Sequence, residues 1–349
     1  MFTWSELPRL ADDAPTLPAR LKQHVSDFVV EEQPAYEPCG TGPHLYLWVE
    51  KRDVAHGQLI AHVAGALGIP DREIGTAGMK DRRAVTRQYV SVPAGCESRV
   101  DRVDSESIRV LARSCHKNKL RTGHLRGNRF SIVARGIPDE HVGDVLKAAV
   151  EIAGTGFPNY FGPQRFGHGG STARQGLELL AGSLLPDDLP GSGRRFLIRL
   201  AVSAAQSLVF NSVLADRLTD RLVTTVLAGD VLERVETGGR FICTEPAVDQ
   251  DRLDEGELVV TGPIAGRKTR QAEGEPARRE AAAIERYELT AECFDRFPRI
   301  TIGSRRPLIV RPGKFTAEPV DDGVKFEFTL PAGSYATVLI REVLGDDVV

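Results

Sequence analysis

The sequence contains few cysteines and none of the common metal or phosphate motifs. Its eight histidines form no HExxH pair, and neither a Walker-type loop nor a GxGxxG after a predicted strand occurs. The cysteines are odd in number, and no two stand at metal-ligand spacing: Cys39, Cys96, Cys115, Cys243 and Cys293. We therefore expect reduced, mostly buried thiols, no metal, no cofactor, and either cofactor-free chemistry or binding alone.

Long apolar runs and a secretory signal are also missing. No segment is expected to be apolar for long enough to span a bilayer. The start, MFTWSELPRL, has acid and proline where a signal peptide needs a basic end and an apolar run. We expect a cytoplasmic protein that does not contact membranes. The formal net charge of −3 argues against indiscriminate coating of nucleic acid, so any polyanion site must be a local patch.

The order of the predicted elements favours an α+β fold with a mixed or antiparallel sheet. Period-two patterns predict strands in HLYLWVEK and RFSIVAR, further strands are expected in QYVSV and ESIRVLAR, and helical spacing predicts helices at 59–67 and 142–153. Because 349 residues exceed one hydrophobic core, two domains are expected. Glycine turns become frequent from Gly156 to about Arg305, and then VKFEFTL and SYATVLIREVLG are typical of a strand and a helix. Since these two elements cannot form a domain alone, we predict that residues 1–155 and 306–349 form one discontinuous domain around an insertion at 156–305.

The densest positive charge lies in RSCHKNKLRTGHLRGNR, residues 113–129. This stretch holds six Lys or Arg and two His but no acid. It favours a site for the phosphate backbone of nucleic acid, with Gly123 and Gly127 allowing the ligand to come close. A solvated loop whose lysines serve solubility is the alternative. The residues expected to follow the backbone are Lys117, Lys119, Arg121 and Arg126.

One acid stands alone in the stretch AGMKDRRAVTRQYVSV, residues 77–92. Asp81 is the only acid between Ile74 and Cys96, and its neighbours in the chain include Lys80, Arg82, Arg83 and Arg87. A carboxylate near cations is favoured in its ionised form, which suits a nucleophile at neutral pH. The same pattern also fits a turn residue, a helix cap or a structural ion pair.

Aromatic residues, glycines and an arginine are grouped in FPNYFGPQRFGHGG, residues 157–170. This composition suits stacking on exposed bases. It equally suits a packed aromatic hinge at the start of the predicted insertion.

Five stretches together resemble one family, the TruD-type tRNA pseudouridine synthases. They are LKQHVSDFVVEE, AGMKDRRAVTRQYVSV, LRTGHLRGNRF, NYFGPQRFG and LPAGSYATVLIRE, and they span essentially the whole chain. The resemblance implies a pseudouridine-synthase catalytic domain made from both outer segments, with the family's TRUD domain inserted between them. It also implies an isomerase without a cofactor, which converts the uridine at position thirteen in the D-arm of tRNA to pseudouridine.

The resemblance assigns roles to six residues. Asp81 matches the catalytic aspartate, and Lys22 matches the lysine that keeps it ionised. The remaining four match residues of the uridine pocket: Phe28, Asn128, Phe130, and Tyr335, which stands where the family has phenylalanine.

The implied reaction breaks a C–N bond, turns the uracil and forms a C–C bond, with Asp81 acting at the sugar C1′ or on the uracil ring. The target base must first be flipped out of the folded tRNA. We expect tRNA as the partner and a monomeric enzyme. Two other classes stay open from the residues alone: an RNA-binding module without catalysis, and a hydrolase of the nucleosidase type.

Overall fold

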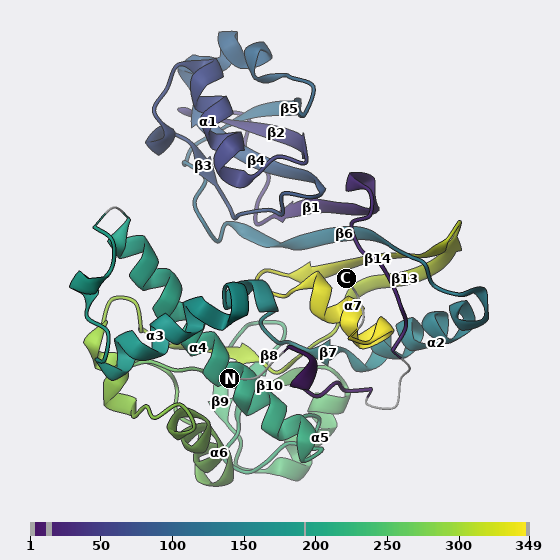
Figure 1. Ribbon diagram of the computed structural model, residues 1–349, viewed down its shortest axis with the longest axis vertical. Coiled ribbons are helices and arrows are strands. Elements are labelled where there is room, and N and C mark those ends of the chain that lie inside the picture. Colours follow the sequence, from purple (N-terminus) through teal and green to yellow (C-terminus); the bar gives the residue numbers. More distant parts are fainter. Residues whose placement is uncertain (1–3, 12–15, 192, 347–349) are drawn as a thin grey trace. The chain divides into compact units, whose positions relative to one another are not determined.

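The computed structural model describes residues 4–11, 16–191 and 193–346 (Figure 1). These residues form two compact units. The sheet unit consists of residues 16–156, 311–336 and 343–346, and the middle unit consists of residues 4–11, 157–191, 193–310 and 337–342. Residues 4–11, 306–310 and 337–342, which the sequence analysis grouped with the outer segments, thus belong to the compact unit of the middle segment. The assignment of the units to a catalytic and an inserted domain stays a prediction.

A mixed eight-stranded sheet forms the sheet unit, which confirms the predicted α+β fold class. Its main path runs β13-β14-β6-β1-β4-β2-β5, and β3 pairs with β4. Only β1 and β4 pair in parallel within this sheet. The strands are β1 (Phe28–Pro34), β2 (His44–Arg52), β3 (Gly75–Thr76), β4 (Val85–Pro93), β5 (Ile108–His116), β6 (Leu125–Arg135), β13 (Gly313–Val320) and β14 (Gly323–Pro331).

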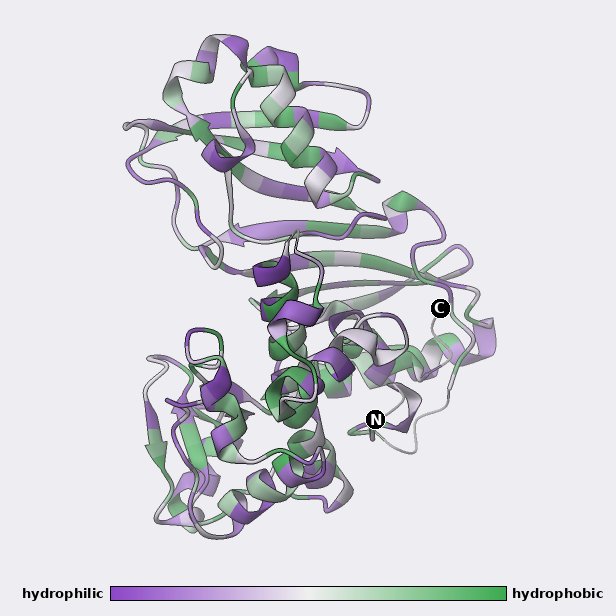
Figure 2. Cartoon of the chain, turned by 60° about the vertical axis from the view of Figure 1, so that its left-hand side comes forward, coloured by the Kyte–Doolittle hydropathy of each residue, from purple (hydrophilic) through white to green (hydrophobic). Residues whose placement is uncertain are grey.

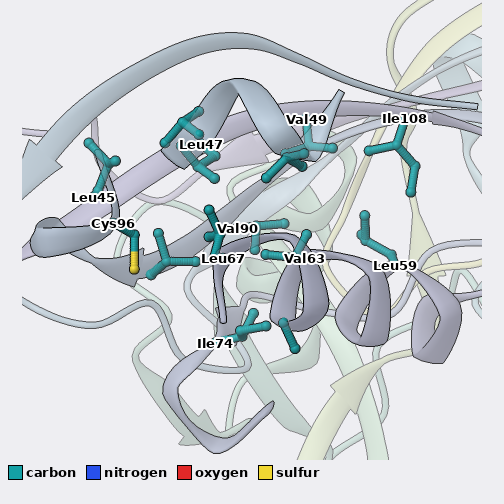
Figure 3. Packing of buried hydrophobic residues seen from close by; sticks show 14 residues of the cluster. Leu45, Leu47, Val49, Leu59, Val63, Leu67, Ile74, Val90, Cys96 and Ile108 are labelled. Carbon is teal, nitrogen blue, oxygen red and sulfur yellow. The ribbon is translucent and has the colours of Figure 1, made fainter. Parts of the chain in front are cut away.

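The first core of this unit follows from the period-two pattern of β2. Leu45, Leu47 and Val49 are fully buried, and they pack with Leu59 and Val63 from helix α1 (His56–Leu67) (Figure 3). Hydrophobic and hydrophilic residues follow one another along the strands of the sheet (Figure 2). The predicted helix is therefore confirmed, and it ends where Gly68 adopts a left-handed conformation with φ 62°.

The strand predicted to return to the first sheet does so. β14 pairs with β6 in antiparallel register, with Phe328 opposite Phe130. Helix α2 (Asp139–Thr155) contacts both β13 and β14. The helix predicted at 142–153 is confirmed, but it runs on through Gly154 and stops at Gly156. The apolar residues on which this prediction depended are only partly buried, since Val150 is 76% exposed.

The middle unit is built around helix α4 (Arg194–Thr219), which was not predicted from the sequence. Helix α4 contacts α3, α6 and β10. It is long and apolar enough to cross a membrane, so the expectation that no such segment exists was wrong. In this unit, 78% of the most apolar 18-residue stretch of α4 is buried, as in the core helix of a globular domain. The elements are β7 (Phe157–Pro158), α3 (Ser171–Ala181), α4 (Arg194–Thr219), β8 (Val231–Arg234), β9 (Arg240–Ile242), α5 (Pro246–Asp254), β10 (Leu258–Ile264), α6 (Gly274–Glu285), β11 (Ser304–Pro307) and β12 (Ile309–Val310); α7 (Ala336–Leu344) carries residues of both units.

The aromatic stretch at residues 157–170 is mainly a packing element. Phe157 and Tyr160 are completely buried, and Phe161 packs edge-on against Phe210 of α4. The structure therefore favours the hinge interpretation over base stacking for this stretch. The five cysteines are all free, but only Cys96 and Cys243 are buried, so the expectation of mostly buried thiols was wrong.

Candidate active site

Asp81 lies in the segment that connects β3 to β4, and its carboxylate contacts Lys22. The Lys22 Nζ atom is 3.2 Å from Asp81 Oδ1, and the two side chains are 22% and 37% exposed. Lys22 adopts φ 57°, a left-handed conformation that costs a lysine about 1 kcal/mol or more. The fold thus holds Lys22 in a strained backbone conformation while its ammonium group pairs with Asp81.

The arginines next to Asp81 in the sequence bind other groups. Arg82 and Arg83 sit on exposed positions, and Arg87 bridges two carboxylates from neighbouring strands. Their partners are Asp53 for Arg82, the Gln23 carbonyl for Arg83, and Glu31 with Glu50 for Arg87. These arginines therefore stabilise the surrounding loop and strands. The cation beside the Asp81 carboxylate is Lys22, which stands 59 residues earlier in the chain.

A buried lysine holds the backbone of Asp81. Lys51 has no exposed surface, and its Nζ donates hydrogen bonds to the carbonyl oxygens of Asp81 and Val54, both at 2.7 Å. Burial lowers the pKa of Lys51 to about 8, and the nearby Asp81 charge partly opposes this effect. Burial is also the main cause that lowers the pKa of His56.

Asn128 belongs to a second polar cluster, with Lys80 and Glu32. Lys80 Nζ lies 3.0 Å from Glu32 Oε2 and donates a hydrogen bond of 2.7 Å to Asn128 Oδ1. The side chains of Lys80 and Glu32 are only 4% and 1% exposed. Because an ammonium group can only donate, Lys80 fixes the orientation of the amide, and the amide NH₂ of Asn128 is the part that can donate to a ligand.

The predicted aromatic residues form a buried row across three strands. Phe28 on β1 and Phe130 on β6 have ring centroids 6.4 Å apart, and Phe130 stacks on Phe328 of β14 at 5.2 Å. Phe28 and Phe130 are only 1% and 5% exposed, so neither ring offers an open face. The Lys22 Nζ atom lies 4.1 Å from the Phe28 centroid, and Phe28 therefore supports the lysine that contacts Asp81.

The remaining predicted residues lie in two loops. Tyr335 is half-buried and directly precedes α7. The basic stretch covers the end of β5, the β5–β6 connection and the start of β6, and we call these residues, 113–129, the basic segment. Gly123 in the connection has φ 93° and serves its turn. A Cβ on Gly127 would lie 2.1 Å from the Leu330 carbonyl oxygen, so this glycine serves strand packing and not the approach of a ligand.

Four cations of the basic segment are available to a polyanion. Lys117, Arg121 and Arg126 are exposed, and Lys119 is half-buried with its Nζ donating to the Arg72 carbonyl. None of the four forms an ion pair with the part of the chain that the structure describes.

Three further residues of this site were not singled out from the sequence: Lys51, Glu32 and Phe328. The sequence nevertheless indicated that their side chains face the interior, because each of the three stands two positions after a buried apolar residue and therefore lies on the same face of the sheet. The preceding residues are Val49, Val30 and Phe326.

The site thus combines the Asp81 carboxylate, its ammonium partner Lys22 and the oriented amide of Asn128. The buried aromatic row lies beside these polar groups. Such a site can present a negative charge to an electrophilic carbon while an amide binds a polar ligand edge. Within residues 4–11, 16–191 and 193–346, no three His, Cys, Asp or Glu side chains are grouped in a way that could hold a metal ion.

The whole chain resembles known proteins of one kind. A family model described as tRNA pseudouridine synthase D (TruD) matches residues 7–185 and 194–343. A protein named tRNA pseudouridine synthase D from Anaeromyxobacter dehalogenans is 41% identical over 339 residues, which cover 97% of this chain and 96% of that protein. A protein of the same name from Thermus thermophilus is 38% identical over 345 residues, or 99% of this chain and 94% of that protein.

A solved structure agrees with these sequence matches. The crystal structure of a candidate tRNA pseudouridine synthase D from Methanosarcina mazei matches with a TM-score of 0.74 and 25% identity. The match covers 96% of this chain and 95% of that one.

Proposed function

The chain belongs to the TruD family of tRNA pseudouridine synthases, and on this premise we propose that it isomerises the uridine at position thirteen in the tRNA D-arm, with Asp81 as the catalytic carboxylate. The enzyme is an isomerase of the pseudouridine-synthase class. We assign the catalytic domain to residues 1–155 and 306–349 and the inserted TRUD domain to residues 156–305.

The contact between Lys22 and Asp81 is the observation that carries this proposal. The reaction breaks the bond between the sugar C1′ and uracil N1 and forms one between C1′ and C5, while the proton on C5 is lost and N1 gains one. Atoms and electrons balance without an oxidant or an external nucleotide. A carboxylate is the nucleophile that such a reaction needs, and Lys22 places a positive charge 3.2 Å from it.

The neighbouring groups supply support for this carboxylate. Lys51 holds the Asp81 carbonyl, which fixes the backbone from which the carboxylate extends. Lys80 orients Asn128 so that its NH₂ group can donate to a uracil carbonyl oxygen. We assign Phe28 and Phe130 to the uridine pocket as its buried apolar support, and Tyr335 as the remaining aromatic residue of the pocket.

Flipping the target base out of a folded tRNA costs a few kcal/mol, and phosphate contacts can offset this cost. We assign these contacts to four cations of the basic segment, Lys117, Lys119, Arg121 and Arg126. Two observations support this assignment. None of the four cations forms an ion pair within the described chain, and residues 113–129 contain no acid.

The substitution Asp81→Asn tests the assignment, because it keeps the shape of the side chain and removes the charge. Pseudouridine formation in an unmodified tRNA transcript should fall by at least about 10³-fold, as when a covalent nucleophile is removed, while tRNA binding stays nearly unchanged. Mapping pseudouridine by position, together with an analysis for free uracil, measures the reaction and its site. Free uracil would indicate a nucleosidase instead.

Asp53→Asn is a matched control for this variant. Like Asp81, Asp53 pairs with a cation, here Arg82 at 3.6 Å, but the Asp53 side chain is 51% exposed. This control should retain pseudouridine formation. Retained isomerisation in Asp81→Asn would refute the nucleophile assignment, whereas a wild-type protein that binds tRNA without modifying it would be an RNA-binding module.

A further inference from the structure

A cavity of the sheet unit lies beside the basic segment. Its volume is about 520 Å³, a size that suits a small ligand. The β1–β2 connection, the start of β2, the end of β5 and the β5–β6 connection contribute its walls. The lining residues are Tyr36, His44, His116, Lys117, Asn118, Lys119, Arg121 and His124.

Charge and aromatic surface are combined in this cavity. Three of the cations assigned to phosphate line it, and no carboxylate does. The rings of Tyr36 and His116 are stacked, with centroids 4.9 Å apart and an interplanar angle of 17°. An ordered stack beside cations is the combination by which proteins bind unpaired nucleotides.

The polar atoms of the cavity wall are arranged before any ligand binds. The Tyr36 hydroxyl is hydrogen-bonded to His124 Nδ1 at 2.7 Å, and the hydroxyl of Tyr46 donates to the Asn118 carbonyl at 2.9 Å. His44 Nδ1 is buried and has no hydrogen-bond partner among the residues that the structure describes. Because a buried polar atom without a partner costs free energy, this nitrogen points to a ligand or a water molecule as its partner.

The cavity is connected to the segment that carries Asp81. The Gly123 N–H donates to the Ala77 carbonyl at 2.8 Å, and the Leu120 N–H donates to Ser91 Oγ at 3.1 Å. Ala77 and Leu120 also pack in one small apolar cluster. The β5–β6 connection, which lines the cavity, is therefore bound to the Asp81 segment at Ala77, four residues before Asp81.

We propose that this cavity binds one nucleotide of the tRNA substrate other than the target uridine, with the base extending the Tyr36–His116 stack and its phosphate near Lys117 and Arg121. The proposal rests on the proposed function, because it takes tRNA as the ligand. It adds a second point of attachment, which places the tRNA relative to the Asp81 segment.

The substitution Asn118→Trp tests the proposal by filling the cavity while leaving every cation in place. Asn118 is exposed in a loop, so the fold should tolerate the change. We expect the dissociation constant for an unmodified tRNA transcript to rise at least about fivefold, the lower end for the loss of one stacked base. The slope of log affinity against log salt should not change, and the loss in turnover should lie in KM more than in kcat.

Arg126→Gln is the matched control, because Arg126 lies in the same basic segment but does not line the cavity. Loss of one phosphate contact should reduce the salt slope by about 0.7 to 0.9. A purely electrostatic role for the basic segment predicts the opposite pattern for Asn118→Trp, namely unchanged affinity. That result would overturn the nucleotide cavity.

Cys39 offers a direct reporter of occupancy. Cys39 is exposed, and its backbone N–H donates to His116 Nδ1 at 3.2 Å. The pKa of its thiol is lowered, mainly by hydrogen bonding with Thr41 and further by the nearby Lys117. Alkylation of Cys39, followed by peptide mass spectrometry, should slow in the presence of tRNA or adenosine 5′-monophosphate. Asn118→Trp should abolish the protection by adenosine 5′-monophosphate.

Two outcomes of the alkylation assay would overturn the proposal. Equal protection by inorganic phosphate and by adenosine 5′-monophosphate would mean that the base is not bound, and no protection by tRNA would mean that the cavity stays empty in the complex. Failure of the proposed function is distinguishable, because the wild-type protein would then form no pseudouridine whatever the state of Cys39.

Discussion

The buried Lys51 makes the stability of the sheet unit depend on pH in a way that a single substitution can isolate. Burial lowers the pKa of Lys51 from its usual 10.5 to about 8. Each pKa unit corresponds to about 1.4 kcal/mol, so keeping the charged amine in the fold costs about 3 kcal/mol. We expect Lys51→Met to remove this dependence on pH.

The direction of the effect follows from which state holds the proton. Below pH 8, Lys51 is protonated in both the folded and the unfolded protein, and the full cost is present. Between pH 8 and 10.5 the folded protein has released this proton while the unfolded chain still holds it, so the free energy of unfolding rises with pH. The difference in this free energy between wild type and Lys51→Met should therefore rise by about 3 kcal/mol from pH 7 to pH 10.5.

Fluorescence of Trp48 gives a readout of the sheet unit alone. The chain has two tryptophans, and Trp4 lies in the middle unit, so both proteins are studied with Trp4→Phe as the background. Urea unfolding at a series of pH values then yields the free energy of unfolding of the unit that contains Lys51.

Lys325→Met is the matched control in the same unit. Hydrogen bonds to Glu327 and Glu318 raise the pKa of Lys325, so its stabilising contribution is present below pH 10.5 and is lost only at higher pH. Its difference from wild type should stay flat between pH 7 and pH 10. Parallel curves for wild type and Lys51→Met would refute the reasoning, because they would show that Lys51 is not desolvated in the fold.

Two further predictions concern the middle unit and the basic segment. Asp230→Asn should lower the free energy of unfolding by about 3–5 kcal/mol, because it breaks an ion pair with Arg217 at 2.7 Å whose side chains are only 2–3% exposed. Asp187→Asn, which breaks an exposed pair with Arg194, should lower it by at most about 1 kcal/mol. Equal effects of the two substitutions in urea unfolding would contradict this account. Replacing Lys117 and Arg121 together by Gln should weaken tRNA binding and reduce the slope of log affinity against log salt by about 1.4 to 1.8; an unchanged slope in filter binding would exclude phosphate contacts by this pair.

The strands of the sheet unit could be predicted from the sequence because they alternate. In β2, in β14 and in residues 130–134 of β6 every second residue is buried, and this pattern is visible without a structure. Helix α4 escaped notice for the opposite reason. Residues 204–215 are buried on all sides of this helix, so no apolar stripe distinguishes one face, and the frequent glycines around it suggested only turns.

Local sequence could show which residues face the sheet interior, but not which of them meet. Lys22 and Asp81 are 59 residues apart, and the stacked Phe130 and Phe328 come from strands on either side of the middle segment. The left-handed backbone of Lys22 gave no signal either, since lysine has no preference for that conformation. The family resemblance pointed to Lys22, whereas Lys51 and Glu32 required the packed structure.

The pairing of β6 with β14 has a consequence for how the protein is made. A ribosome must synthesise about 190 residues between the end of β6 and the start of β14. At usual rates of translation this takes about 10 to 40 s. During that interval the β6 edge, which carries Phe130 and Ile132, has no neighbouring strand and is open to wrong pairing. The nascent chain therefore depends on whatever shields this edge until β14 has left the ribosome.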